Sequence, residues 1–147
     1  MLGLIGIALS LSAKGMEPQL GVKWDNPFQN SHIVSSTKGA VPLQQKDCDR
    51  AAYNDCTFRA SVDFDGDGRL DRAYMANVGS VGIIAVSFAN PRKKPMVVAS
   101  FRGRLNGSSY IKVDRRDKRT IIFVQPEASM AEIRMISGKP RIRWIGD

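Results

Sequence analysis

Short runs of β-forming residues, separated by turn residues, fill the chain after residue 56. Eight such runs lie at 57–62, 72–78, 82–89, 95–101, 109–113, 120–124, 130–136 and 140–145. They are rich in Val, Ile, Phe, Tyr and Thr, while Gly, Pro, Asn and Asp stand between them. The pattern predicts a mainly β single domain. We expect an antiparallel meander of about eight short strands, which forms a sandwich, a curled sheet or a small barrel.

The last two runs carry enough alternation to predict their register. A hairpin turn at 138–139 would pair Met135 with Ile142 and Ile133 with Trp144, so that four apolar side chains share one face. We expect that face to lie on the core.

The other face of the same hairpin is basic. In this register Arg134 lies directly opposite Arg143, which costs stability because like charges oppose each other across the strands. Glu132, diagonal to Arg143, is the nearest compensating charge. The functional alternative is an anionic partner lying over Arg134, Arg141 and Arg143, which are therefore candidate anion-binding residues.

The N-terminal part has a different character. Residues 1–13 are an apolar run of the length of a secretory signal, and we expect residues 1–15 to be a signal peptide. A buried strand or helix is the alternative, because no basic residue precedes the run. Residues 16–46 should form an extended or irregular segment, and 47–147 the β domain. After residue 15 no run approaches the eighteen apolar residues of a membrane-spanning helix, so we expect none in the mature chain.

Two cysteines, Cys48 and Cys56, suit an oxidising compartment, periplasmic or extracellular. We expect a disulfide between them, with two buried thiols as the alternative. The segment between them has a mildly helical composition, yet eight helical steps would separate the two Cα atoms by roughly 12 Å. A bridge and a continuous helix therefore exclude each other. Zinc is not expected, because His32 is distant and is the only histidine.

Positive charge is concentrated in the C-terminal part. Residues 1–90 contain 8 basic and 9 acidic side chains, whereas 91–147 contain 14 basic and 5 acidic ones. Solvated strand faces are one interpretation of this excess. The other is binding of an unknown protein, an acidic glycan or an anionic surface. Nucleic acid is the least expected partner, since no aromatic ladder is interleaved with the basic residues.

The segment "DFDGDGRLD" at 63–71 has aspartate at every second position except 69, which is an arginine. Counted as a calcium loop, Asp63, Asp65 and Asp67 take positions 1, 3 and 5, and the Arg69 carbonyl takes position 7. Asp71 at position 9 supplies a fourth carboxylate. Position 12 is a tyrosine where an EF-hand needs glutamate, so the loop at 63–74 is not an EF-hand.

Calcium accepts this ligand set more readily than magnesium, which demands strict octahedral geometry and keeps most of its water. We therefore expect Ca²⁺ as the cofactor, and Leu70 at position 8 should pin the loop to the core. A plain polar hairpin turn is the alternative, but it would leave crowded carboxylates to repel one another.

The loop resembles the DxDxDGxxD calcium loops of integrin-type FG-GAP and VCBS repeats. That resemblance implies antiparallel strands on both sides of the loop and ligands at Asp63, Asp65, Asp67, Asp71 and the Arg69 carbonyl. It covers about fourteen residues in a single copy, so the propeller of those families is not implied. The single loop and the C-terminal "RWIGD" also resemble small exported bacterial proteins of unknown function.

These patterns favour an exported, calcium-stabilised β domain that acts as a non-catalytic binding or interaction module. No nucleophile motif accompanies the lone histidine, so a catalytic triad has little material. A small calcium-dependent hydrolase and a protein inhibitor of a secreted enzyme are the alternatives.

Overall fold

Each of the eight predicted runs overlaps a β-strand in the computed structural model, which describes residues 34–50, 54–125 and 130–145. The strands are β1 (Val41–Pro42), β2 (Arg59–Val62), β3 (Asp71–Val78), β4 (Val81–Ser87), β5 (Met96–Arg102), β6 (Tyr110–Val113), β7 (Ile121–Val124), β8 (Met130–Ile136) and β9 (Lys139–Ile145). A short 3₁₀ helix, η1 (Gln45–Asp47), precedes β2. The mainly β prediction is confirmed, and β1 and η1 are additions to it. Within the described ranges, no helix has the length and apolarity needed to cross a bilayer.

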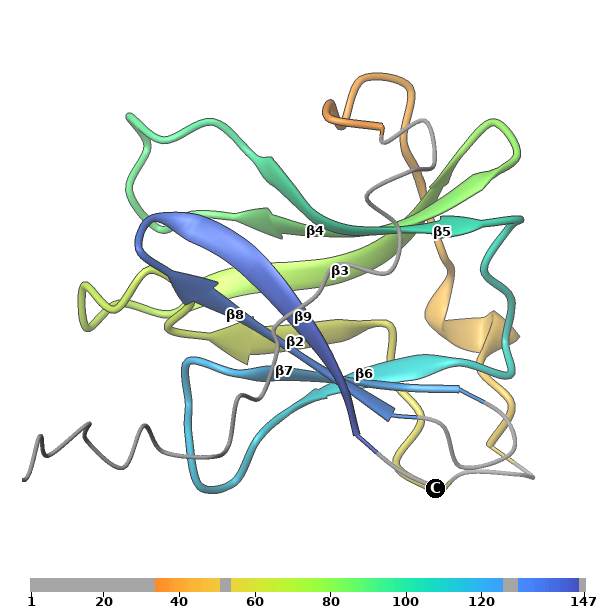
Figure 1. Cartoon of the computed structure of the whole chain (residues 1–147). Helices are drawn as coiled ribbons and strands as arrows, with labels where there is room; N and C mark the ends of the chain where they lie inside the picture. Colours follow the sequence, from red (N-terminus) through yellow and green to blue (C-terminus); the bar gives the residue numbers. More distant parts are fainter. Residues whose placement is uncertain (1–33, 51–53, 126–129, 146–147) are drawn as a thin grey trace, which may run out of the picture.

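The strands form two antiparallel sheets that lie one over the other (Figure 1). The first sheet has the order β1-β3-β4-β5, with β2 also paired to β3, and the second has the order β6-β7-β8-β9. Near one edge the sheets are joined by a hydrogen bond of 2.9 Å from the Ile111 amide to the Thr57 carbonyl. At the opposite edge β9 lies near β5. Neighbouring strands are mostly consecutive in sequence, as expected for a meander.

The main core lies between the two sheets. The rings of Phe101 from the first sheet and Phe123 from the second are 4.6 Å apart, and Trp144 contacts Phe123 edge-on. A smaller cluster covers the opposite face of the first sheet, where Ile83 packs with residues that include Val34. Strand β4 is therefore buried on both faces, which explains its almost continuous apolar sequence.

The N-terminal segment is less irregular than expected where it is described. Its residues 34–46 contribute β1 and the start of η1, and Leu43 is buried in the main core. The predicted signal peptide at 1–15 and residues 16–33 lie outside the described residues. The Cys48–Cys56 disulfide is present, with the two Cα atoms 5.9 Å apart. The predicted bridge is therefore confirmed over the alternative of two buried thiols.

The predicted register of the last hairpin is wrong by two residues. The turn consists of Ser137 and Gly138, with φ of 51° and 73°, so that Ile133 lies opposite Ile142 and not opposite Trp144. Two consecutive positive φ values define a type I′ turn, whose twist matches the twist of the strands. A shift of two residues keeps every side chain on its predicted face. The apolar face therefore still points to the core.

Candidate metal centre

The aspartate loop, residues 63–70, joins β2 to β3, and the two strands pair up to its base at Val62 and Asp71. Gly66 and Gly68 have φ of 73° and 83°, a conformation that costs other residues about 1–2 kcal/mol. The Asp63 carbonyl accepts a hydrogen bond of 3.3 Å from the Gly66 amide. Glycine at these two positions lets the chain turn tightly enough for alternate side chains to point inward.

Three of the predicted ligands converge. Asp63, Asp65 and Asp71 each offer a carboxylate oxygen, and these oxygens lie within 4.8 Å of one another. Calcium binds oxygen at 2.3–2.6 Å, so two ligands on opposite sides of one ion are separated by at most about 5 Å. The spacing therefore fits a single coordination sphere of that size, and the three aspartates could hold a metal ion.

Asp71 has a structural task of its own. Its side chain is buried, at 2% exposure, and accepts one hydrogen bond of 3.0 Å from the Phe64 amide and another of 2.8 Å from the Ala89 amide. Phe64 belongs to the loop, whereas Ala89 follows β4. One carboxylate thus ties the loop to the segment after β4.

Asp67 lies outside this cluster. Its carboxylate accepts hydrogen bonds from the Arg69 guanidinium, at 2.8 and 3.1 Å, and from the Arg69 amide, at 2.9 Å. The guanidinium contact, and then the amide, lower the pKa of Asp67, and the same pairing raises the pKa of Arg69. Ligation by Asp67 and by the Arg69 carbonyl remains a prediction.

The prediction that Leu70 pins the loop to the core is wrong. Leu70 is 63% exposed, whereas Phe64 is 1% exposed and belongs to the main core. Counting along a calcium loop cannot distinguish the two positions, because burial is decided by what the loop meets in space. The anchor lies at the second residue of the loop.

Sequence reasoning did not identify Lys93 as a neighbour of the aspartate loop. Its ammonium group lies 2.6 Å from the Asp65 carboxylate and 5.3 Å from the centre of the Phe88 ring. Hydrogen bonding to Asp65 raises the pKa of Lys93. The β3–β4 pairing brings residues 88–93 beside the loop, although Asp65 and Lys93 are 28 residues apart. The aspartate loop therefore already contacts a positively charged side chain of the protein.

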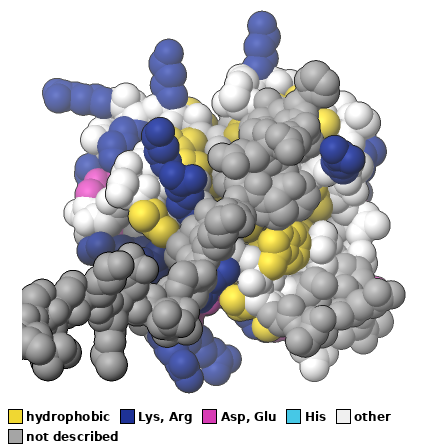
Figure 2. Space-filling model, viewed as in Figure 1, with side chains coloured by type: hydrophobic (Ala, Val, Ile, Leu, Met, Phe, Trp, Pro, Cys, Tyr) yellow, Lys and Arg dark blue, Asp and Glu magenta, His cyan; other side chains and the backbone are white. Residues whose placement is uncertain are grey.

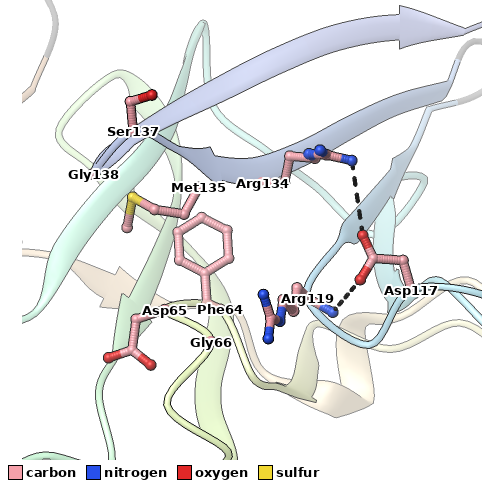
Figure 3. A pocket seen from close by; sticks show the side chains of 9 residues that line it. All are labelled: Phe64, Asp65, Gly66, Asp117, Arg119, Arg134, Met135, Ser137 and Gly138. Atoms are coloured by element: carbon pink, nitrogen blue, oxygen red, sulfur yellow. Dashed lines mark hydrogen bonds and ion pairs between the residues drawn. The ribbon is translucent and has the colours of Figure 1, made fainter.

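Beside the loop lies a cleft of about 450 Å³, which we call the arginine cleft (Figure 3). Its lining comes from the aspartate loop, the β6–β7 turn and the β8–β9 hairpin, namely Phe64, Asp65, Gly66, Asp117, Arg119, Arg134, Met135, Ser137 and Gly138. The loop and the second sheet also meet directly, through a hydrogen bond of 3.1 Å from the Asp63 amide to the Lys118 carbonyl. The candidate metal centre thus lies where the two sheets come together.

Asp117 organises one wall of the arginine cleft. It accepts hydrogen bonds from the Thr120 hydroxyl, at 2.7 Å, and the Arg119 amide, at 3.0 Å, and it lies 3.9 Å from Arg134. The Thr120 hydroxyl is the main cause of the lowered pKa of Asp117, and the Arg119 amide and the positive charge of Arg134 add to it.

The basic face of the last hairpin differs from the predicted one. Arg134 lies opposite Arg141, not Arg143, and Glu132 lies directly opposite Arg143 and forms an ion pair with it. The expected compensation by Glu132 is present and is direct, not diagonal. Binding of an anion over Arg134, Arg141 and Arg143 remains a prediction, and two of these arginines already contact an acidic side chain.

Comparison of the chain with family models, with curated proteins and with solved structures gives no match. The likeness to FG-GAP and VCBS repeats is a likeness of the loop, without a matching family model.

Proposed function

We propose that this chain is an exported β domain, periplasmic or secreted, that a structural calcium ion stabilises and that binds an anionic partner without catalysis. One observation carries the calcium part. Asp63 and Asp65 from the loop and Asp71 from β3 bring carboxylate oxygens within 4.8 Å of one another.

These residues fit a calcium ion chemically. Carboxylate oxygens are the hard ligands that calcium prefers, and backbone carbonyls and water complete its six to eight contacts. A bound ion would supply positive charge and offset the repulsion among the three carboxylates. Asp71 already holds the loop to the end of β4 through two amides. Calcium would therefore further stabilise a loop conformation that these two hydrogen bonds already hold.

The binding part rests on charge. The chain carries a net charge of +8, and Lys and Arg side chains predominate over acidic ones on the face shown in Figure 2. Such a surface attracts polyanions and speeds their encounter. Export is supported by the Cys48–Cys56 disulfide, which persists in oxidising compartments.

Thermal unfolding with and without calcium tests the first part. Extracellular calcium modules bind at about 10⁻⁴ to 10⁻³ M. At about 10 mM calcium the ion would then stabilise the native state by roughly 1.4–2.7 kcal/mol. We expect the melting temperature to rise by roughly 3–10 °C over its value in EGTA. An unchanged transition would contradict the calcium site.

Matched variants locate the effect. Asp63→Asn and Asp65→Asn should reduce the calcium-dependent rise in melting temperature. Asp114→Asn changes the net charge equally but lies in the β6–β7 turn, and its side chain keeps an acceptor for the Arg116 amide. The rise should persist in that control. Equal losses in all three variants would assign the effect to general charge screening.

Retention on immobilised heparin tests the binding part. We expect elution at a salt concentration that falls when Arg141 and Arg143 are both changed to Gln, since each contact to a polyanion contributes to the salt dependence. Absence of retention at low salt would contradict the anionic partner.

A further inference from the structure

Two guanidinium groups from different elements reach the arginine cleft. Arg119 comes from the β6–β7 turn and Arg134 from β8, and both side chains lie over the same hollow (Figure 3). The carboxylate of Asp65, at the other end of the cleft, points away from them and pairs with Lys93. The part of the cleft between the two arginines is therefore basic, apart from Asp117.

Arg119 lies close to the aspartate loop. Its backbone amide donates to Asp117, and its guanidinium lies against the backbone of Gly66, where an added Cβ would be only 3.0 Å from the Arg119 Cζ atom. A side chain at position 66 would push this guanidinium away. Glycine there serves both the tight turn of the loop and the placement of Arg119.

Arg119 and Arg134 differ in their pairing. Asp117 lies 3.9 Å from Arg134 and offsets part of its charge. Within the described residues, the guanidinium of Arg119 has no hydrogen bond or ion pair. An arginine in this situation offers a planar pair of N–H donors that matches one carboxylate.

The other residues that line the cleft indicate the class of ligand to which such a carboxylate would belong. Ser137 and Gly138, at the exposed tip of the β8–β9 hairpin, offer a hydroxyl and backbone groups, and Met135 is an apolar side chain of the wall. Hydroxyl-rich ligands with one apolar ring face suit such a lining, whereas a peptide anchor needs a deep apolar pocket. We propose that the arginine cleft binds a uronate unit of an acidic polysaccharide, with Arg119 as the principal contact to its carboxylate. This inference deepens the proposed anion-binding role and rests on it.

Calorimetric titration of the full chain in calcium-containing buffer tests the assignment. The probes are a galacturonate tetramer, a neutral galactose tetramer and a glutamate peptide of equal charge. We expect binding of the galacturonate tetramer alone. Arg119→Gln should weaken it at least tenfold, because a charge-assisted contact is lost. Arg119→Lys, which keeps the charge but not the planar fork, should fall between that variant and the unchanged protein.

Arg116→Gln is the matched control, because Arg116 lies in the same turn, is exposed and does not line the cleft. It should change the affinity less than twofold. In a heteronuclear NMR titration the amides of Gly66 and Ser137 should shift.

The alternative outcomes are distinct. Equal losses for Arg116→Gln and Arg119→Gln would overturn the cleft while leaving a general basic surface and the proposed function. Equal or tighter binding of the glutamate peptide would overturn the sugar assignment. Failure of all anionic probes, together with no retention on heparin, would overturn both the cleft and the anionic partner.

Discussion

A substitution at Asp71 tests most directly how the aspartate loop is held in place. Its carboxylate is buried and accepts the amides of Phe64 and Ala89, at 3.0 and 2.8 Å. Asp71→Asn keeps the shape but replaces one acceptor oxygen by an NH₂ group. One of the two amide donors is then left facing another donor.

Two effects of this change oppose each other. Losing a charge-assisted hydrogen bond in a buried position costs about 2–3 kcal/mol. Removing one negative charge relieves repulsion with Asp63, whose oxygen lies within 4.8 Å; Asp63 is only partly buried, and measured charge pairs that are open to solvent interact by up to about 1 kcal/mol, so this gain is about 1 kcal/mol. Repulsion from Asp65 is smaller, because Lys93 pairs with it. The lost hydrogen bond should outweigh the relieved repulsion, so that Asp71→Asn lowers the free energy of unfolding by roughly 1–2 kcal/mol.

Thermal unfolding in EGTA and in calcium separates the two roles of Asp71. In EGTA we expect a fall in melting temperature of roughly 2–8 °C, from the energies above and the usual scaling for a chain of this length. In calcium the gap should widen, since a ligand is also lost. Asp67→Asn, in the same loop but outside the cluster, should change the value in EGTA by less than about 2 °C. A melting temperature of Asp71→Asn in EGTA that is unchanged or higher would refute this reasoning, because repulsion would then outweigh the hydrogen bonds.

Two further predictions concern the neighbours of the loop. Lys93→Gln should strengthen calcium binding roughly two- to fivefold, because it removes a cation that contacts Asp65; calorimetry with calcium measures this, and weaker binding would show that Lys93 instead supports the site. Phe64→Ala should destabilise the fold by about 3–5 kcal/mol in urea unfolding, whereas Leu70→Ala should stay within about 0.5 kcal/mol, and equal effects would contradict the anchoring of the loop by Phe64.

The strands, the disulfide and the acidic cluster follow from short stretches of sequence. The alternation of side chains in a strand and the residues that favour turns act over a few positions, so all eight strand runs were found in outline. The even pair of cysteines likewise predicted the bridge that is present. The tight spacing of aspartates predicted an acidic cluster, and three of its four carboxylates converge.

The two failures have different causes. The turn, which consists of Ser137 and Gly138, was predicted one residue too late, and that error was enough to place Arg134 opposite Arg143 in the prediction, whereas Arg134 lies opposite Arg141. Leu70 was expected to be the anchor of the loop, because spacing within a motif says nothing about which side meets the core.

The sequence by itself therefore determined the strands, the bridge and the position of the acidic loop, because backbone periodicity and turn chemistry are local. Only the tertiary structure decided that Phe64 anchors the loop, that Lys93 pairs with Asp65 and that Arg119 lies against Gly66. Lys93 and Asp65 are 28 positions apart in the sequence, and Arg119 and Gly66 are 53 positions apart. These contacts depend on how the paired strands and the two packed sheets bring the loop together with the β4–β5 connection and the β6–β7 turn, which no local pattern encodes.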